Sequence, residues 1–273
     1  MKTLPLYVFV GPSSLPSLRL LCWSLAQFSG SKRLVFVTPR SLTASVTAAS
    51  LDLPCDIVND EDVPGSIFVL RFLRQHSQEL LIRSRSANWY YQQYLKLAVA
   101  WFSDEPVFIQ DGDTIFSAKI LNELALDPQV LCTRENIRQY DAGLSLFGLP
   151  KVGVSCIANG GIFCPRLLAR LGADPKEWFL SAFIRSVLSS PLPSSDFSEY
   201  QVMGSLMSND HSLRQISLFR RLDLLSFGSF DHQTRFVARA LNRYDAVAFE
   251  WAHRRSRLQR IGALLKYVSG QSW

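Results

Sequence analysis

The sequence predicts an α/β protein in which a mostly parallel central sheet is flanked by helices. Short runs of β-branched and aromatic residues alternate with longer segments whose apolar residues recur at helical spacing. Turn-forming residues follow the apolar runs, and 48% of the 273 residues are hydrophobic while 19% are charged. This composition supports a sizeable core, and the strand–helix–strand alternation favours parallel pairing. We expect one domain over residues 1–249 and a basic helical tail over residues 250–273.

The chain is predicted to open with a β-α-β unit. Leu6–Val10 and Arg33–Val37 are short apolar runs that precede turn formers, and Leu15–Phe28 between them has a helical pattern. Further along, a hydrophobic strand at Pro106–Gln110 leads into the turn Asp111-Gly112-Asp113. The other elements expected in this half are a short strand at Asp56–Val58 and helices at Ser41–Ser50, Ser66–Arg83, Asn88–Phe102 and Ser117–Leu126.

The second half of the chain has a less regular pattern. Strands are expected at Gly153–Cys156 and Gly161–Cys164, on either side of Asn159-Gly160. Asp174 and Pro175 are typical of a helix start, because Asp accepts hydrogen bonds from backbone N–H groups and proline fits the first turn. The Pro- and Ser-rich stretch 189–195 predicts an irregular surface loop. The remaining elements expected are helices at Asp174–Leu188, Glu199–Met207 and Thr234–Asn242 and strands at Arg214–Phe219 and Asp245–Phe249.

Charge and cysteine usage narrow the functional class. The formal net charge is +6 and Arg outnumbers Lys, which favours phosphate or carboxylate partners. The charge is modest and no helix-turn-helix, zinc or RNA-binding signature is present, so no nucleic-acid partner is expected. The five cysteines are scattered without Cys-x-x-Cys spacing, which indicates reduced thiols. Without a secretory signal or an apolar run of about 18 residues, we expect a cytoplasmic protein, either free or peripheral to the inner membrane.

The acidic turn carries the clearest chemical signal. Asp111 and Asp113 follow a hydrophobic strand and are separated by Gly112, which permits a bend close to a ligand. In extended backbone, residues two apart point to the same side. Two carboxylates at the end of a strand suit Mn²⁺ or Mg²⁺, and such an ion can bridge and neutralise a diphosphate. The alternative is a solvated Asp-Gly turn.

The sequence around this turn resembles a known enzyme family. Trp89, Gln92, Gln93, Lys96 and Leu97 form a Trp-x-x-Gln-Gln-x-x-Lys-Leu pattern, which a strand and Asp-x-Asp-Thr follow. These motifs are similar to those of GT-A glycosyltransferases, above all bacterial sugar transferases and, more distantly, glycogenin-like enzymes; the resemblance covers about residues 85–210. It implies a nucleotide-sugar donor, a divalent metal on the Asp-x-Asp motif, and a glycan or lipid-linked acceptor of the bacterial surface polysaccharide or lipopolysaccharide type.

Two parts of the chain are candidates for binding the donor. Open α/β sheets bind ligands beyond the carboxyl ends of their strands, so the end of the first strand is expected to hold the nucleoside. Gln92, Gln93 and Lys96 lie within one helical turn and can line one cleft, where Lys96 would balance phosphate charge. The residues expected at the nucleoside are Val10, Gly11, Ser13 and Thr38. Asp111 and Asp113 are expected to hold the metal and the diphosphate, and Gly112 is also a candidate for donor binding.

A third donor candidate is the segment Asn159-Gly160-Gly161. It resembles the Asn-x-Gly segment with which glycogenin-like enzymes contact the donor sugar. Asn supplies both a donor and an acceptor, and glycine lets the backbone approach a sugar. A plain β-turn is the alternative explanation for the same residues.

Glu199 is the candidate general base, with Asp196 as the second candidate. The related transferases have a Ser-Glu-Tyr segment at the place of Ser198-Glu199-Tyr200, and GT-A enzymes commonly present an acidic residue there. Such a base takes the proton of the acceptor hydroxyl as it attacks the sugar, a role that lapses if the product retains configuration. The structural alternative is that Ser198 caps a helix and Glu199 is favoured in its first turn.

Two histidines and the C-terminal tail complete the candidates. GT-A folds often add a late histidine to the metal shell, which makes His211 and His232 candidate ligands; as an alternative, both are surface residues. The tail from Trp251 combines Arg residues with an apolar helical face, so it is expected either to contact a membrane surface or to dock on the core.

Two other functions use the same residues. The first is a non-catalytic glycan- or nucleotide-binding protein that keeps the fold. The second is a metal-dependent nucleotidyl or phosphoryl transferase, which should release pyrophosphate or phosphate instead of a nucleoside diphosphate or monophosphate.

Overall fold

The structure is a computed structural model and describes residues 4–28, 33–50, 53–77, 80, 86–134, 138–185, 198–220 and 229–249. Its central sheet has five strands in the order β3-β2-β1-β4-β7. The first four pair in parallel and β7 pairs with β4 in the antiparallel sense. The strands are β1 Leu6–Phe9, β2 Leu34–Thr38, β3 Cys55–Asn59, β4 Val107–Asp111 and β7 Gly160–Phe163. The predicted mostly parallel sheet is therefore confirmed.

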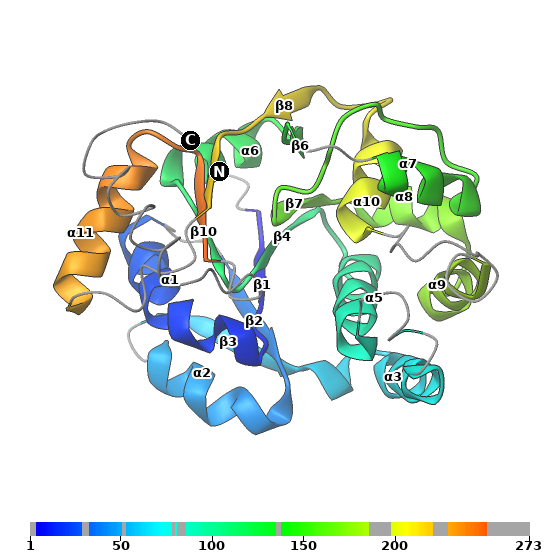
Figure 1. Cartoon of the computed structure of the whole chain (residues 1–273), viewed down its shortest axis with the longest axis horizontal. Coiled ribbons are helices and arrows are strands. Elements are labelled where there is room, and N and C mark those ends of the chain that lie inside the picture. The colour runs from blue at the N-terminus through cyan, green and yellow to red at the C-terminus, as the bar shows by residue number, and fades with distance from the viewer. Residues whose placement is uncertain are drawn as a thin grey trace, which may run out of the picture.

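Helices cover the central sheet. Figure 1 shows α1 and α2 on one side of it and α5, with α3 and α9 beyond, on the other. The helices are α1 Leu15–Phe28, α2 Thr43–Ala49, α3 Ser66–Gln75, α5 Ala87–Trp101, α6 Ala118–Leu126, α7 Arg138–Leu144, α8 Pro165–Leu168, α9 Pro175–Phe183, α10 Glu199–Met207 and α11 Phe230–Leu241. This arrangement is the α/β architecture that the alternation of elements predicts.

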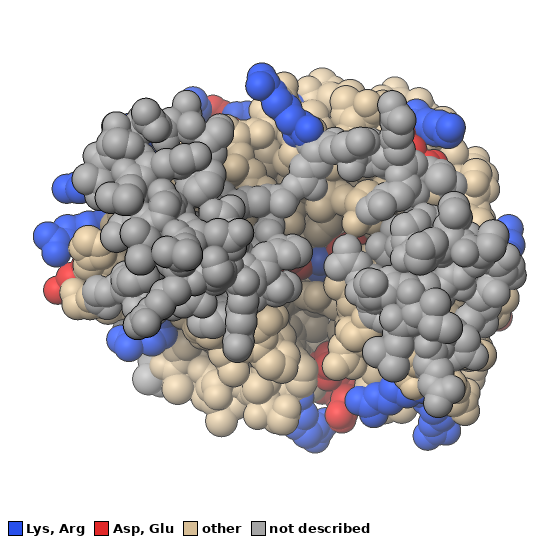
Figure 2. Space-filling model, viewed as in Figure 1, with Lys and Arg blue, Asp and Glu red and all other residues tan. Residues whose placement is uncertain are grey.

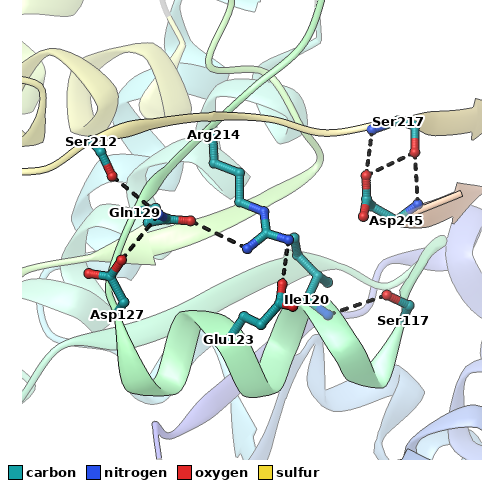
Figure 3. Close-up of polar contacts among 9 residues, drawn as sticks. All are labelled: Ser117, Ile120, Glu123, Asp127, Gln129, Ser212, Arg214, Ser217 and Asp245. Carbon is teal, nitrogen blue, oxygen red and sulfur yellow. Dashed lines mark hydrogen bonds and ion pairs between the residues drawn. The ribbon is translucent and has the colours of Figure 1, made fainter.

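Two small sheets extend the fold beyond the end of β4. One has the order β5-β10-β9 and the other pairs β6 with β8. Their strands are β5 Thr114–Phe116, β6 Val130–Cys132, β8 Leu213–Gln215, β9 Leu218–Arg220 and β10 Ala246–Ala248. Figure 3 shows polar contacts around them: Arg214 of β8 reaches Glu123 of α6, and Ser217, just before β9, donates to the carboxylate of Asp245, just before β10, over 2.8 Å.

The structure corrects several sequence predictions. No strand forms at Gly153–Cys156, because Gly153 has a left-handed φ of 76° and Ser155 alone makes an isolated bridge, to Thr133. The single strand expected at Arg214–Phe219 is two strands, β8 and β9, which pair in different sheets. The short elements β5, β6, α7 and α8 were not predicted. Parts of the expected helices at 66–83 and 174–188, the loop at 189–195 and the tail at 250–273 lie outside the described residues.

Helix α5 is held in place by aromatic packing. Tyr90 packs edge-on against Phe183 of α9 at 5.1 Å, and Tyr94 packs against Phe179 at 5.2 Å. The Tyr94 hydroxyl also donates to the Pro64 carbonyl at 2.7 Å, before α3. Both tyrosines are fully buried, so the polar face of α5 is fixed toward the end of β4.

Two further findings concern the cysteines and the lengths of the helices. All five cysteines are free thiols, as their scattered spacing predicts. Burial raises the pKa of the Cys22 and Cys156 thiols to about 12, which leaves both in the unreactive protonated form. Within the described ranges, no helix has both the length and the apolar character that crossing a bilayer requires.

Candidate active site

The central feature of the site is a buried lysine between two carboxylates. The Lys96 Nζ lies 2.5 Å from Asp111 Oδ1 and 2.6 Å from Glu199 Oε1. The three residues come from α5, the end of β4 and the first position of α10. The side chain of Lys96 is 4% exposed and that of Glu199 is 5% exposed, whereas that of Asp111 is 21% exposed. Asp111 is therefore the member of the cluster that faces outward.

The electrostatics keep the lysine charged. Burial alone would lower the pKa of Lys96, but the carboxylates of Asp111 and Glu199 raise it well above its ordinary value. Burial raises the pKa of the Glu199 carboxyl, although Lys96 acts in the opposite direction. The two carboxylates thus keep the Lys96 ammonium protonated, and an ammonium has three N–H donors, so it can also donate a hydrogen bond to a bound anion.

Tyr200 completes the surroundings of the lysine. The Lys96 Nζ lies 4.5 Å from the centre of the Tyr200 ring, in a cation–π contact. Burial, with Asp111 next in order of effect, raises the pKa of the Tyr200 phenol well above its ordinary value, so this group stays neutral. Ser198 caps α10 by accepting a hydrogen bond from the Gln201 backbone N–H, as expected, and this fixes Glu199 at the start of the helix.

The Asp111-Gly112-Asp113 turn is anchored on the first strand. The Gly112 N–H donates to the Phe9 carbonyl at 2.8 Å, and the Ser17 hydroxyl donates to the Gly112 carbonyl at 3.2 Å. A Cβ at Gly112 would lie 2.8 Å from that same Phe9 oxygen. Close approach of two backbones therefore requires glycine here. Asp113 Oδ1 accepts a hydrogen bond from the Thr114 hydroxyl at 3.3 Å.

A cleft of about 530 Å³ opens at the carboxyl ends of β1 and β2. Figure 2 shows a hollow near the middle of the viewed face, with charged side chains at its floor. Phe9 lines the cleft and pairs in register with Asp111, so the acidic turn lies one strand away. The predicted donor residues that line the cleft are Val10, Gly11, Ser13, Thr38 and Gln92.

The remaining donor candidates are placed differently. Gln93 lies one turn before Lys96 and is 2% exposed, and neither of its amide atoms has a hydrogen-bond partner among the residues that the structure describes. Asn159 has a left-handed φ of 55° and its carbonyl accepts from the Asp111 N–H at 3.0 Å. A Cβ at Gly160 would lie 2.5 Å from the Phe116 ring, whereas at Gly161 the nearest atom would be 3.9 Å away. Gly160 is thus required by core packing.

Within the described residues, the two candidate histidines are not grouped with the Asp111 and Asp113 carboxylates. His211 contacts the Pro128 carbonyl at 3.0 Å through Nδ1, and His232 is exposed in the first turn of α11. Across the ranges that the structure describes, no group of three or more His, Cys, Asp and Glu side chains could hold a metal ion. Neither histidine therefore meets Asp111 and Asp113 in such a group. Asp196 lies outside the described residues.

Sequence reasoning missed three features of the site. The contact between Lys96 and Glu199 joins residues 103 positions apart, and no local pattern signals it. The ring of Tyr200 against the ammonium was also not expected. Arg40, Arg74 and the aromatic residues Trp89 and Tyr91 line the cleft as well. The cluster of aromatic residues on α5 could have indicated that Trp89 and Tyr91 line a binding cleft.

The packing of Gly160 leads to a stability prediction. We expect Gly160→Ala to lower the free energy of unfolding by about 1–3 kcal/mol, because the new methyl group overpacks against Phe116. Gly161→Ala is the matched control and should be neutral or slightly stabilising in chemical denaturation. Equal stability of the two variants would show that Gly160 is not required by packing.

The buried lysine leads to a second prediction. We expect Lys96→Met to lower the free energy of unfolding by about 3–5 kcal/mol near pH 7.5, because Glu199 is left buried without its partner. The folded variant then binds a proton on Glu199 at a pH where the unfolded chain does not, so its stability should fall as pH rises from about 5 to about 8. Denaturation curves across this range measure both effects.

Two further variants test this explanation. Arg33→Met, which breaks the exposed pair with Asp56, should cost less than about 1 kcal/mol. Adding Glu199→Gln to Lys96→Met should restore part of the lost stability and flatten its pH dependence. A Lys96→Met loss as small as that of Arg33→Met would contradict the buried pair.

The chain is similar to solved structures but not to any family model or curated protein. No protein-family model matches the sequence, and no curated protein matches it significantly. Mouse xyloside xylosyltransferase 1, in its apo form, is similar in structure with a TM-score of 0.50 and 11% identity, over 93% of this chain and 100% of that chain. The galactosyltransferase LgtC, in complex with donor and acceptor sugar analogues, has a TM-score of 0.46 and 14% identity, over 99% and 97% of the two chains.

A third solved structure has a lower score. The glycosyltransferase GlyE of Streptococcus pneumoniae TIGR4 has a TM-score of 0.44 and 11% identity, over 98% of this chain and 64% of that chain. The likeness to the mouse xylosyltransferase, together with the mostly parallel sheet flanked by helices, shows that the chain has a GT-A glycosyltransferase fold.

Proposed function

We propose that the protein is a metal-dependent glycosyltransferase that moves a sugar from a nucleotide-sugar donor to a glycan or lipid-linked acceptor. The GT-A fold supports this function. The observation that carries it is the buried Lys96 beside the Asp111-Gly112-Asp113 turn, one strand away from a 530 Å³ cleft. A cation and two carboxylates at the rim of a nucleotide-sized cleft suit the transfer of a group whose leaving group is a diphosphate.

The cleft supports a position for the donor. Its floor is formed by the ends of β1 and β2, and the nucleoside would lie against Val10, Gly11 and Ser13. The Thr38 hydroxyl donates to the Val10 carbonyl at 3.0 Å and so fixes the shape of this floor. The diphosphate would then point toward Asp111 and Lys96, because Phe9 joins the cleft to that turn.

The residues present fit a divalent cation. Asp111 and Asp113 offer hard carboxylate oxygens, although Asp111 Oδ1 is already ion-paired with Lys96. Mg²⁺ is often bound by one or two carboxylates together with substrate phosphates, so this pair is sufficient without a protein histidine. When bound there, the ion would neutralise the charge that develops on the leaving diphosphate.

Lys96 and Glu199 have separate parts in the proposed reaction. Lys96 keeps a proton at Nζ and would donate it in a hydrogen bond to the leaving phosphate, while Asp111 and Glu199 orient the ammonium. In an inverting reaction Glu199 would accept the acceptor's proton at Oε2, since Oε1 is paired with Lys96. The raised pKa of this buried carboxyl favours such a role. In a retaining reaction Glu199 would only position Lys96.

Ligand binding and turnover test this proposal together. A nucleoside diphosphate with Mn²⁺ should stabilise the protein by about 2.7 kcal/mol at a ligand concentration of 100 times Kd, and much less without the metal. In a screen of nucleotide sugars, Asp111→Asn and Asp113→Asn should each lower kcat/KM by about 10²–10³-fold, because transition-state charge loses its counterion.

A control variant and the released product distinguish a glycosyltransferase from a nucleotidyl transferase and from a non-catalytic binding protein. Asp56→Asn, at an exposed carboxylate on β3, should leave turnover unchanged. Release of pyrophosphate would indicate a nucleotidyl transferase, and metal-dependent binding without turnover would indicate a non-catalytic binding protein. Undiminished turnover in both the Asp111 and Asp113 variants would rule out the proposed metal site.

A further inference from the structure

Large apolar side chains are exposed on or directly after two neighbouring helices, α3 and α9. Six such side chains are exposed within the described residues, and three of them lie on α3 or directly after α9. Ile67 and Phe68 in the first turn of α3 are 57% and 56% exposed, and Ile184 is 41% exposed. Clustering of this kind marks a contact surface, whereas single exposed apolar residues do not.

Direct contacts join the two helices into one surface, which we call the α3–α9 face. The Phe72 ring of α3 packs edge-on against Phe183 of α9 with 6.1 Å between ring centres. Lys176 of α9 lies over the Phe68 ring at 5.4 Å. The exposed apolar residues of α3 therefore lie beside a cation of α9.

The charge of the α3–α9 face is basic. Arg71, Arg74 and Arg185 are exposed. Lys176 is partly exposed and pairs with Asp174 at 3.5 Å, and Glu177 is the other acidic residue of α9, so four basic residues stand against two acidic ones. The acidic residues that precede α3, Glu61 and Asp62, are paired with Arg40. Figure 2 shows basic side chains at the lower right of the molecule, where Figure 1 places α3.

We propose that the α3–α9 face binds the surface of an anionic lipid bilayer. The combination of Ile67 and Phe68 with neighbouring Arg residues matches the chemistry of such a surface, because apolar side chains enter the region of the headgroups while cations pair with lipid phosphates. A second copy of this chain would present the same cations, so charge complementarity favours lipid over self-association.

The position of the face agrees with the proposed function. Arg74 of the α3–α9 face also lines the cleft, together with Leu70, so the proposed membrane surface adjoins the donor cleft. This part of the inference rests on the proposed function: a membrane contact here would place the mouth of the cleft near an acceptor carried on a lipid. Among the two acceptor classes, the geometry therefore favours the lipid-linked one.

Vesicle sedimentation of the full chain tests the proposal. The protein should bind vesicles of phosphatidylcholine with about 30% phosphatidylglycerol much more tightly than vesicles of phosphatidylcholine alone. The double variant Ile67→Ser/Phe68→Ser should bind the anionic vesicles at least about tenfold more weakly, because it loses two apolar anchors. Arg71→Gln should weaken binding about fivefold, and more at low salt than at high salt.

A matched control keeps the result specific to this face. Leu126 of α6 is 75% exposed but lies elsewhere on the chain's fold, so Leu126→Ser should bind as the wild type does. Wild-type binding to neither vesicle, equal binding to both, or unchanged binding by the double variant would each overturn the proposal. A double variant that changes only the oligomeric state would show an interface between copies and would also overturn it. Vesicle binding is measured without a nucleotide sugar. A failure of the proposed transferase activity would therefore not change this result.

Discussion

The buried ion pair of Lys96 with Asp111 and Glu199 is the constraint on which the site depends. It joins a helix, the end of a sheet strand and the start of a second helix, which lie far apart in the sequence. An ammonium that is 4% exposed is stable only where carboxylates compensate for its lost hydration. Displacing α5 would therefore leave Glu199 buried without its partner, and displacing either of the other two elements would take one of two carboxylates away from Lys96. The relative positions of α5, the end of β4 and the start of α10 are thus set by electrostatics as much as by packing.

The sequence predicts the parts of this arrangement that local patterns encode. Strand β4 and the acidic turn follow from a hydrophobic run and Asp-Gly-Asp, and the start of α10 follows from Ser198 as its cap. The pairing of Lys96 with Glu199 does not follow, since the fold alone brings together residues 103 positions apart. The same limit applies to β8 and β9, whose partners are chosen by tertiary context.

At Gly112 and Gly160, the structure gives a different reason for glycine from the one that the sequence suggests. At Gly112 and Gly160 the sequence indicates backbone left open for a ligand. In the structure, Gly112 is required because a side chain would meet the Phe9 carbonyl, and Gly160 because it would meet the Phe116 ring. Both glycines therefore act through the protein's own packing. They shape the acidic turn and the start of β7 without needing to touch a ligand.

The charge balance of the cluster is consistent with the proposed metal ion. With Asp111, Asp113 and Glu199 ionised and Lys96 protonated, the four groups carry a net charge of about −2, and this repels a diphosphate at short range. A divalent cation on the outward-facing Asp111 and Asp113 would bring the sum to about zero. Lys96 already holds one oxygen of Asp111, so the protein alone offers such an ion few ligands. The proposed metal would then be held firmly only when donor phosphates complete its coordination, which couples metal binding to donor binding.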